Sequence, residues 1–300
     1  MATEFAGATM SGPGAQLRAR LAEPGILVLP GVHDALSARI AARVGFGAIM
    51  AGGNAANGTL LAAPDMGQLG MRDLADHYGR IAAAAGVPVL VDADTGFGGV
   101  HNAAATVRAF ERVGVAGLFM EDQVTPKRCG YLAGKAVVPV AEQLAKLRAA
   151  LDARGDADFL ICARTDALAV EGIDAAIERA VLYKQTGVDM VFVQGADTAD
   201  SLRRVCQAIP GYHLANVSQA GGATKLSVPD AQAAGAAAIM FPIAALLAAA
   251  SAIEQVMQTL HRDHALDAAA ASLMPMARYN DLTDLAGVQA REDRWNRGEG

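Results

Sequence analysis

The chain has 300 residues and a mass of 30.7 kDa, and its net charge is −6 from 25 basic and 31 acidic side chains. Hydrophobic residues make up 53% and charged residues 19%, which excludes a disordered chain because such a chain lacks the apolar surface that offsets ordering entropy. The basic residues form no stripe, so we expect no nucleic-acid partner. Three cysteines cannot build a disulfide framework and favour a reducing compartment.

Two segments bear on location. Residues 1–20 lack a basic region followed by an apolar core, so they do not form a secretory signal. Residues 233–253 carry no charge, but they are mostly alanine and Pro242 divides them. Because alanine is too weakly apolar for a membrane span, we interpret this stretch as a buried strand followed by an alanine-rich helix. We therefore expect a cytoplasmic protein with no membrane partner.

Eight short apolar runs recur along the chain, and most are continuous, as expected for strands buried on both faces of a parallel sheet. They are Ile26–Pro30, Gly47–Ala51, Pro88–Asp92, Val115–Glu121, Phe159–Thr165, Asp189–Gln194, Tyr212–Asn216 and Ala237–Pro242. Helical patterns separate them. Leu36, Ile40 and Val44 recur at every fourth position, and Gly45 is a predicted C-terminal cap. Similar periodicity occupies residues 103–113 and 175–186.

Eight strand–helix units in about 250 residues predict a (β/α)8, or TIM, barrel, with a doubly wound open sheet as the alternative. No proline- or glycine-rich linker divides the chain, so we predict a single domain over residues 1–300. Residues 254–300 form a predicted C-terminal helical extension, which is a candidate for exchange between subunits.

In such a barrel the active site lies at the C-terminal ends of the strands. Asp92 and Asp94 end the third run, and because they are two residues apart we expect both side chains on one side of a strand. Together with Glu121 from the fourth run they form an all-oxygen cluster, which favours Mg²⁺ or Mn²⁺ over zinc. The alternative is that the two aspartates only cap the turn before the next helix.

The fourth run is followed by EDQVTPKRCGYLAGK, a long polar loop of the kind that acts as a lid over barrel sites. Cys129 lies in it next to Lys127 and Arg128, and neighbouring cations favour the thiolate form. We therefore expect Cys129 to exchange a proton. Cys162 and Cys206, in an apolar run and on a predicted helix, are interpreted as inert.

Two further strand ends carry polar side chains suited to a carboxylate substrate. Arg164 ends the fifth run, where it either holds a substrate carboxylate by a two-point contact or forms an ion pair with a rim acid such as Glu121. Asn216 ends the seventh run and Ser218 follows it, so both can donate hydrogen bonds to a second carboxylate; strand-end capping is their alternative role.

The segments GVHDALSARI, VDADTGFGG, EDQ, PKRCG and ART together resemble the isocitrate lyase / phosphoenolpyruvate mutase superfamily between residues 20 and 260. The branch that the chain resembles most is that of methylisocitrate lyase and 2,3-dimethylmalate lyase. The resemblance implies a (β/α)8 barrel in a homo-oligomer, a dimer or a tetramer of two dimers that exchange C-terminal helices. It also implies Mg²⁺ at Asp92, Asp94 and Glu121, with Asp65 in the acidic network.

The activity implied by this resemblance is that of a carbon–carbon lyase. A substituted 2-hydroxy di- or tricarboxylic acid, like methylisocitrate or dimethylmalate, is cleaved to a 2-oxo acid (pyruvate or glyoxylate) and a carboxylic acid. Cys129, with Lys127 beside it, would protonate the leaving fragment as general acid, and Arg164 would hold a carboxylate. Gly52 and Gly53 would let backbone N–H groups approach the substrate. The implied substrate-binding residues are Gly52, Gly53, Asn54, Gly130, Tyr131, Gln194, Asn216 and Ser218.

Four positions depart from the pattern of these lyases, which carry histidine where this chain has Tyr131 and Phe119, glutamate at Gln194, and serine or threonine at Gly52. Each change removes a polar or ionisable group, so we expect activity on a small carboxylate other than ordinary methylisocitrate. The apolar Phe119 indicates a less polar substituent. The alternatives are a carboxyphosphonoenolpyruvate mutase-like enzyme, an oxaloacetate decarboxylase and a non-catalytic barrel that binds dicarboxylates.

Overall fold

The computed structural model describes residues 12–217 and 225–299. The chain divides after Ala245 into two compact units, and the division lies near the start of helix α11 (Ala244–Asp263). The single domain expected from the sequence, with its extension at residues 254–300, stays a prediction.

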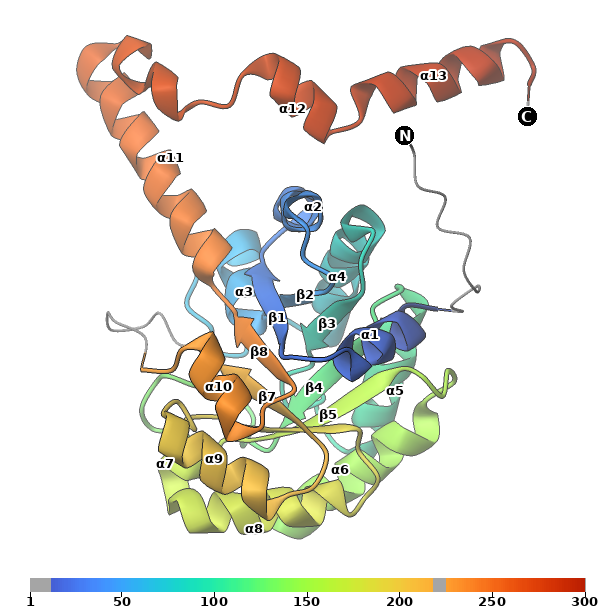
Figure 1. Cartoon of the computed structure of the whole chain (residues 1–300), viewed down its shortest axis with the longest axis vertical. Coiled ribbons are helices and arrows are strands. Elements are labelled where there is room, and N and C mark those ends of the chain that lie inside the picture. Colours follow the sequence, from blue (N-terminus) through green and yellow to red (C-terminus); the bar gives the residue numbers. More distant parts are fainter. Residues whose placement is uncertain (1–11, 218–224, 300) are drawn as a thin grey trace. The chain divides into compact units, whose positions relative to one another are not determined.

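The first unit is built on eight parallel strands that close into a barrel in chain order (Figure 1). The strands are β1 (Leu27–Val32), β2 (Ile49–Ala51), β3 (Val89–Asp92), β4 (Gly117–Glu121), β5 (Leu160–Thr165), β6 (Met190–Val193), β7 (Tyr212–Asn216) and β8 (Ala238–Phe241). Each lies in one of the eight predicted runs, although β1 continues to Val32. Leu27 of β1 pairs with Ala238 of β8, so the sheet has no edge. The (β/α)8 barrel is confirmed, and the open sheet is wrong.

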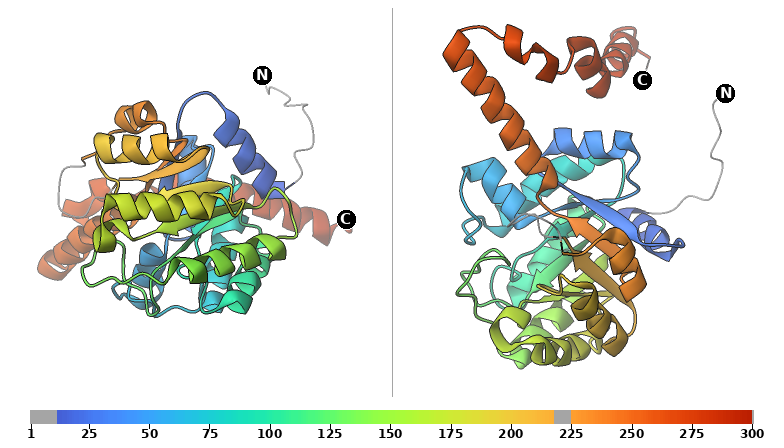
Figure 2. Two further views of the ribbon diagram at one scale, coloured as in Figure 1. Left: turned by 90° about the horizontal axis from the view of Figure 1, so that it is seen from below. Right: turned by 60° about the vertical axis from the view of Figure 1, so that its left-hand side comes forward.

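Helices surround the barrel on its outside, as Figure 2 shows. They are α1 (Gly12–Ala22), α2 (Ala35–Val44), α3 (Gly53–Leu61), α4 (Met71–Ala85), α5 (Val100–Arg112), α6 (Val140–Ala153), α7 (Leu168–Glu171), α8 (Ile173–Lys184), α9 (Ala199–Ala208) and α10 (Val228–Ala234). The predicted cap of α2 is present, because Gly45 has a φ of 109°, a left-handed conformation that glycine adopts without strain. At the other end of α2, the Asp34 carboxylate accepts a hydrogen bond from the Ser37 backbone N–H.

The core has two layers. One lies between strands and helices and contains Tyr78 and Phe110, whose rings meet edge to face with centroids 5.5 Å apart. The other fills the barrel, where Leu17 of α1 joins the cluster at the amino ends of the strands. Phe119 and Met240 belong to the same interior cluster. The barrel is thus packed rather than hollow, as this fold requires.

The second unit consists of most of α11 followed by three shorter helices. These are η1 (Asp267–Ser272), α12 (Met276–Leu282) and α13 (Leu285–Asn296). Large apolar side chains along it are exposed, among them Met276 (67%) and Trp295 (63%). The uncharged stretch 233–253 contains β8 and the start of α11, as expected. In the part of the chain that the structure describes, no helix is long and apolar enough to cross a membrane.

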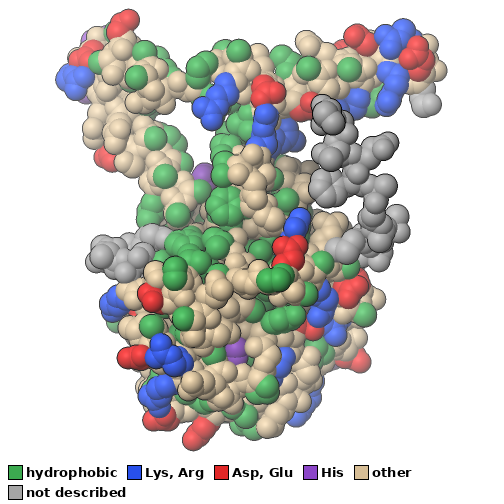
Figure 3. All heavy atoms as spheres, in the orientation of Figure 1, with side chains coloured by type: hydrophobic (Ala, Val, Ile, Leu, Met, Phe, Trp, Pro, Cys, Tyr) green, Lys and Arg blue, Asp and Glu red, His purple; other side chains and the backbone are tan. Residues whose placement is uncertain are grey.

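Figure 3 shows one face of the molecule, on which acidic and basic side chains are interspersed over the barrel unit. Apolar side chains reach this solvent boundary as well. On α2, Leu36, Ile40 and Val44 are all more than a third exposed, while Ala38 and Ala41 are buried. Helix α2 also packs against α4. Its small residues Ala38 and Ala41 belong to the core, and its large apolar side chains are left partly exposed.

Candidate active site

A pocket of about 510 Å³, its open mouth included, lies at the C-terminal ends of the strands, where barrel active sites form. Its lining contains eleven of the residues predicted from the sequence: Gly52, Gly53, Asn54, Asp65, Asp92, Cys129, Gly130, Tyr131, Arg164, Gln194 and Asn216. Three others, Asp94, Glu121 and Lys127, contact this lining set by ion pairs or close approach. Ser218 lies outside the described residues.

Asp92 and Asp94 lie on one side of the pocket, but not because both belong to the strand, as the sequence predicted. Asp92 is the last residue of β3, whereas Asp94 lies beyond the strand in the left-handed region, with a φ of 46°. Asp92 Oδ1 accepts the Asp94 N–H at 2.9 Å, and Asp92 Oδ2 accepts the Gly53 N–H at 3.2 Å. A Cβ on Gly53 would lie 3.0 Å from Asp94 Oδ1, a tight contact that glycine avoids. The Gly53 N–H is thus directed to Asp92.

Lys127 lies among these carboxylates. Its Nζ is 2.7 Å from Asp65 and 2.7 Å from Asp94 Oδ1, and its side chain is 4% exposed. Burial acts to lower the pKa of Lys127, but the carboxylates, Asp94 first, outweigh it and raise that pKa well above its usual value. Lys127 is therefore a fixed ammonium ion that holds Asp65 and Asp94 together. Its place in the sequence suggested that it acts on the Cys129 thiol, but its ammonium group pairs with these two carboxylates instead.

Glu121 closes the acidic side from the end of β4. Its side chain is 1% exposed, and neither carboxylate oxygen has a hydrogen-bond donor in good geometry, although Arg164 Nη2 is 2.8 Å from Oε2. Burial raises the pKa of Glu121 well above its usual value, and burial likewise raises the pKa of Asp94 to about 7. In both carboxylates burial outweighs the neighbouring cation, which is Arg164 for Glu121 and Lys127 for Asp94 and which by itself would lower the pKa.

The donor set fits a divalent cation. Within residues 12–217 and 225–299, no three acidic, histidine or cysteine side chains come close enough to form a ready metal site. The rim nevertheless holds the five carboxylates of Asp65, Asp92, Asp94, Glu121 and Asp166, with the three cations Lys127, Lys135 and Arg164 that pair with them. When all five carboxylates are ionised, they exceed the three cations by two negative charges, which one Mg²⁺ would neutralise. An all-oxygen set suits Mg²⁺, which keeps several waters and takes few carboxylates directly.

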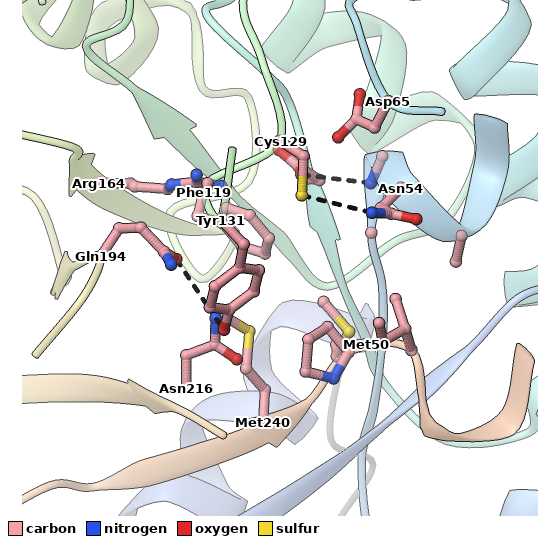
Figure 4. A pocket seen from close by; sticks show the side chains of 17 residues that line it. Met50, Asn54, Asp65, Phe119, Cys129, Tyr131, Arg164, Gln194, Asn216 and Met240 are labelled. Atoms are coloured by element: carbon pink, nitrogen blue, oxygen red, sulfur yellow. Dashed lines mark hydrogen bonds between the residues drawn. The ribbon is translucent and has the colours of Figure 1, made fainter. Parts of the chain in front are cut away.

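Cys129 faces the pocket from the lid loop, residues 122–139 between β4 and α6. Its Sγ accepts a hydrogen bond from Asn54 Nδ2 at 3.3 Å (Figure 4). Its N–H donates to the Asp65 carbonyl at 3.0 Å. Arg128, its other cationic neighbour in the sequence, donates to the Ala133 carbonyl. The thiol is thus positioned by the amide of Asn54 in the first turn of α3, a contact that the sequence did not reveal.

Arg164 forms the ion pairs that were one of its two expected roles. Its Nε and Nη2 donate to Asp166 at 2.8 and 3.2 Å, and Nη2 also contacts Glu121. Its guanidinium carbon lies 5.4 Å from the centre of the Phe192 ring. Because Arg164 also lines the pocket, both roles stay open. Asp166 itself was not singled out, although its place directly after the ART segment is the signal that could have found it.

Two more residues escaped the sequence analysis. Asp122, next to Glu121, is fully buried and accepts hydrogen bonds from the hydroxyls of Thr165 (2.7 Å) and Tyr183 (2.9 Å). Lys135, at the far end of the lid loop, reaches Asp166. Burial acts to raise the pKa of Asp166, but Arg164 and Lys135 outweigh it, so that pKa lies below its usual value. Strand-end position signals Asp122, and nothing in the local pattern signals Lys135.

The opposite wall of the pocket carries no ionised group other than Arg164 among the described lining residues. Asn216 Nδ2 donates to the Tyr131 hydroxyl at 2.6 Å and to Gln194 Oε1 at 3.3 Å, and Figure 4 shows Tyr131 pointing from the lid toward them. Phe119 is 1% exposed and meets Phe192 edge to face at 6.0 Å. All four departures from the lyase pattern, Gly52 included, line this pocket.

Known proteins have a similar fold and sequence. A family model described as phosphoenolpyruvate phosphomutase matches residues 17–261. The 2,3-dimethylmalate lyase of Eubacterium barkeri is 36% identical over 95% of this chain and 98% of its own, and the 2-methylisocitrate lyase of Shewanella oneidensis is 38% identical over 94% and 95%. A structure of phosphonopyruvate hydrolase with oxalate and Mg²⁺ has a TM-score of 0.84 at 27% identity, covering 95% of this chain and 99% of that one. The motifs indicated the right relatives, and the chain belongs to the phosphoenolpyruvate mutase/isocitrate lyase superfamily.

Proposed function

We propose that the protein is a carbon–carbon lyase that cleaves a substituted 2-hydroxy di- or tricarboxylic acid to a 2-oxo acid and a carboxylic acid. The observation that carries this proposal is the pocket itself, which has the Cys129 thiol on its lid and an excess of carboxylates at its rim. The names of the relatives, 2,3-dimethylmalate lyase and 2-methylisocitrate lyase, support the same reaction class.

In such a cleavage, each of several pocket side chains would have its own role. Arg164 lies where it can hold a substrate carboxylate by two N–H groups. The substrate hydroxyl would give its proton to one of the rim carboxylates and become the carbonyl of the 2-oxo acid as the C–C bond breaks. The electron pair of that bond stays on the departing carboxylic-acid fragment, and the Cys129 thiol donates the proton that quenches it. The Asn54 amide holds that sulfur toward the pocket. The lid loop excludes water that would otherwise intercept the fragment.

We propose Mg²⁺, with Mn²⁺ as a substitute, as the cofactor. Asp92, Asp94 and Glu121 would hold it, with Asp65 acting through Lys127. When bound, the cation supplies Lewis-acid stabilisation of negative charge on substrate oxygens. The excess of two negative charges at this rim supports the proposal, as does the Mg²⁺ that accompanies oxalate in the complex of the related phosphonopyruvate hydrolase.

The substrate we favour has a neutral substituent. A tricarboxylate needs a cation for its third carboxylate, whereas the wall formed by Met50, Phe119 and Met240 is apolar and Asn216, Gln194 and Tyr131 are uncharged. Burying a carboxylate there without a partner is costly. A malate with alkyl substituents meets no such penalty, which favours the dimethylmalate-like substrate over the methylisocitrate-like one.

Assembly and location complete the proposal. We propose a homo-oligomer, a dimer or tetramer, in which exposed apolar side chains are covered by another subunit. These side chains include Ile253, Met276 and Trp295 in the second unit, and Val44 on α2. Surfaces of this kind mark protein–protein contacts. The three free cysteines fit a reducing cytoplasm.

A turnover screen tests the function. The purified protein is incubated with Mg²⁺ and a panel of substituted malates, citrates, isocitrates and oxaloacetate, and release of pyruvate or glyoxylate is followed by coupled reduction. We expect release from a substituted malate, lost in Cys129→Ser and with a chelator. Release from oxaloacetate alone, unchanged in the variant, would make the protein a decarboxylase. No release from any compound would point to phosphonate chemistry or to a binding protein.

A further inference from the structure

One lysine joins the lid loop to the barrel from the inside. Lys135 lies near the end of the lid loop, yet its side chain is only 3% exposed. Its Nζ donates to the Gly130 carbonyl at 2.6 Å and to Asp166 Oδ1 at 2.8 Å. Gly130 is the residue directly after Cys129, and Asp166 directly follows β5. A single ammonium group therefore bridges the catalytic segment of the lid and the rim of the barrel.

The segment that Lys135 holds is tightly seated. A Cβ on Gly130 would lie 2.7 Å from Arg164 Nη2 and 2.8 Å from Gln194 Cδ, so the lid backbone packs directly against these two pocket side chains. Only a residue without a side chain allows this approach. Any movement of Gly130 away from the rim therefore breaks the contact of the lid with Arg164 and Gln194.

The anchor on the barrel side is rigid. Asp166 holds Arg164 through Nε and Nη2, and its own N–H donates to Asp122 Oδ1 at 2.9 Å. Asp122 is fixed in turn by the hydroxyls of Thr165 and Tyr183. Such a network of buried, charge-assisted hydrogen bonds keeps its members in one arrangement.

Other contacts hold a different part of the lid. The Gln123 side chain accepts the Arg128 N–H at 3.0 Å and donates to its carbonyl at 2.9 Å, and the Cys129 N–H donates to Asp65. These bonds fix the lid up to Cys129. After Cys129, Lys135 holds the Gly130 backbone itself, while Asn216 holds the tip of the Tyr131 side chain and the Val124 N–H holds the Ala136 carbonyl further along. Removing Lys135 therefore loosens the backbone on one side of the thiol and leaves the other side attached.

We propose that Lys135 is a positioning residue that latches the lid over the pocket by joining Gly130 to Asp166, and so sets the place of the Cys129 thiol relative to Arg164. Its mechanistic meaning rests on the proposed function, in which Cys129 is the acid. The latch itself is a property of the protein without substrate. It can therefore be tested without turnover.

The test is the alkylation rate of Cys129 by N-ethylmaleimide in the full-length protein, followed by peptide mass spectrometry. We expect Lys135→Met to label Cys129 at least about tenfold faster than the unsubstituted protein, because hydrogen bonds to charged groups typically shift an opening equilibrium by that factor or more. Lys135→Arg, which keeps a cationic donor, should restore most of the protection. Lys146→Met is the matched control, since Lys146 is a buried lysine paired with Glu142 on α6.

Cys162 reports on global unfolding in the same sample, because it is fully buried and labels only when the barrel opens. If Lys135→Met labels Cys162 as well, Lys135→Gln is used in its place. Equal Cys129 rates in the unsubstituted protein and a folded Lys135 variant would overturn the proposal, as would an equal increase in Lys146→Met. In turnover, the latch predicts a loss in kcat that exceeds any rise in KM. Absence of turnover in every sample would count against the proposed function and leave the labelling result standing.

Discussion

The two ends of the barrel both carry ion pairs, but only one end balances its charges. At the amino ends of the strands, Asp189 receives Arg18 at 2.7 Å, Arg154 at 2.9 Å and the Ile161 N–H at 2.9 Å. Arg18 also lies 3.6 Å from Asp158, so two carboxylates meet two cations. At the carboxyl ends, five carboxylates share three cations and Glu121 has no hydrogen-bond donor. The first arrangement holds α1 and α6 to the barrel. The second is costly without a ligand, and sites that are costly in the free protein are typical of function.

The largest effect is expected where the charge excess is highest. Asp94→Asn removes one of the two carboxylates that share Lys127, at a left-handed position that asparagine tolerates. We expect turnover to fall by about 10³-fold or more, because a ligand that stabilises developing charge is lost. The melting temperature in chelator should stay equal or rise, since the repulsion is relieved. Coupled 2-oxo acid assays and thermal denaturation measure the two effects.

Asp152→Asn is the matched control for that variant, because Asp152 is an exposed aspartate on α6. It should change neither turnover nor the melting temperature. A marked fall in the stability of Asp94→Asn would contradict the comparison, because it would mean that the carboxylates at this end stabilise the barrel as Asp189 does.

The second effect concerns the lid thiol. Cys129→Ser replaces a good proton donor with a poor one and keeps the hydrogen-bonding position beside Asn54. We expect turnover to fall by about 10²–10⁴-fold, the usual contribution of general acid catalysis. Mg²⁺ binding, measured by calorimetry, should be unchanged because the thiol lies on the lid. Cys206→Ser, on α9, should retain full turnover, and a similar loss in both variants would rule out the proposed role.

The third effect belongs to the balanced end. Asp189→Ala leaves Arg18, Arg154 and the Ile161 N–H without their acceptor, so we expect a loss of about 2 kcal/mol in the free energy of unfolding. In a barrel of this size that lowers the melting temperature by roughly 5 °C. Asp158→Ala, at a half-exposed neighbour of Arg18, should cost less than about 0.5 kcal/mol. At temperatures below both transitions kcat should be unchanged, and a lower kcat would show that the two ends are coupled.

The sequence predicted the parts of this molecule that depend on local pattern. Every apolar run became a strand, because parallel strands are buried on both faces and their composition shows it. The helix α2 and its C-terminal cap at Gly45 were predicted for the same reason, because both depend on neighbouring residues in the sequence. The buried face of α2 was not predictable, since Ala38 and Ala41 face the barrel and the larger Leu36 and Ile40 face outward. Hydrophobic size alone does not reveal which face a neighbouring helix leaves free.

In the site, likewise, the sequence predicted where a side chain lies but not which side chain it contacts. Strand-end position correctly brought Asp92, Arg164 and Asn216 to one pocket. The partners of these side chains depend on contacts between segments far apart in the chain. Neighbours in sequence suggested Lys127 for the Cys129 thiol, but Lys127 Nζ pairs with Asp65, 62 residues away. Lys135 went unnoticed for the same reason, because only the fold brings it to Asp166.

The smallest effect concerns the choice of substrate. It depends on the contrast between the carboxylates on one side of the pocket and the apolar wall on the other. Phe119→His places an ionisable ring in the middle of β4 beside Phe192. We expect the ratio of kcat/KM for a tricarboxylate to that for a substituted malate to rise by about tenfold, because one new polar contact in a pocket shifts discrimination by this order. Phe119→Leu, which changes the size of the side chain but not its polarity, should leave that ratio unchanged even if both rates fall. An unchanged ratio in Phe119→His would mean that the wall does not select the substituent. A rise in both variants would mean that the size of Phe119 excludes the third carboxylate and that its lack of polarity does not matter.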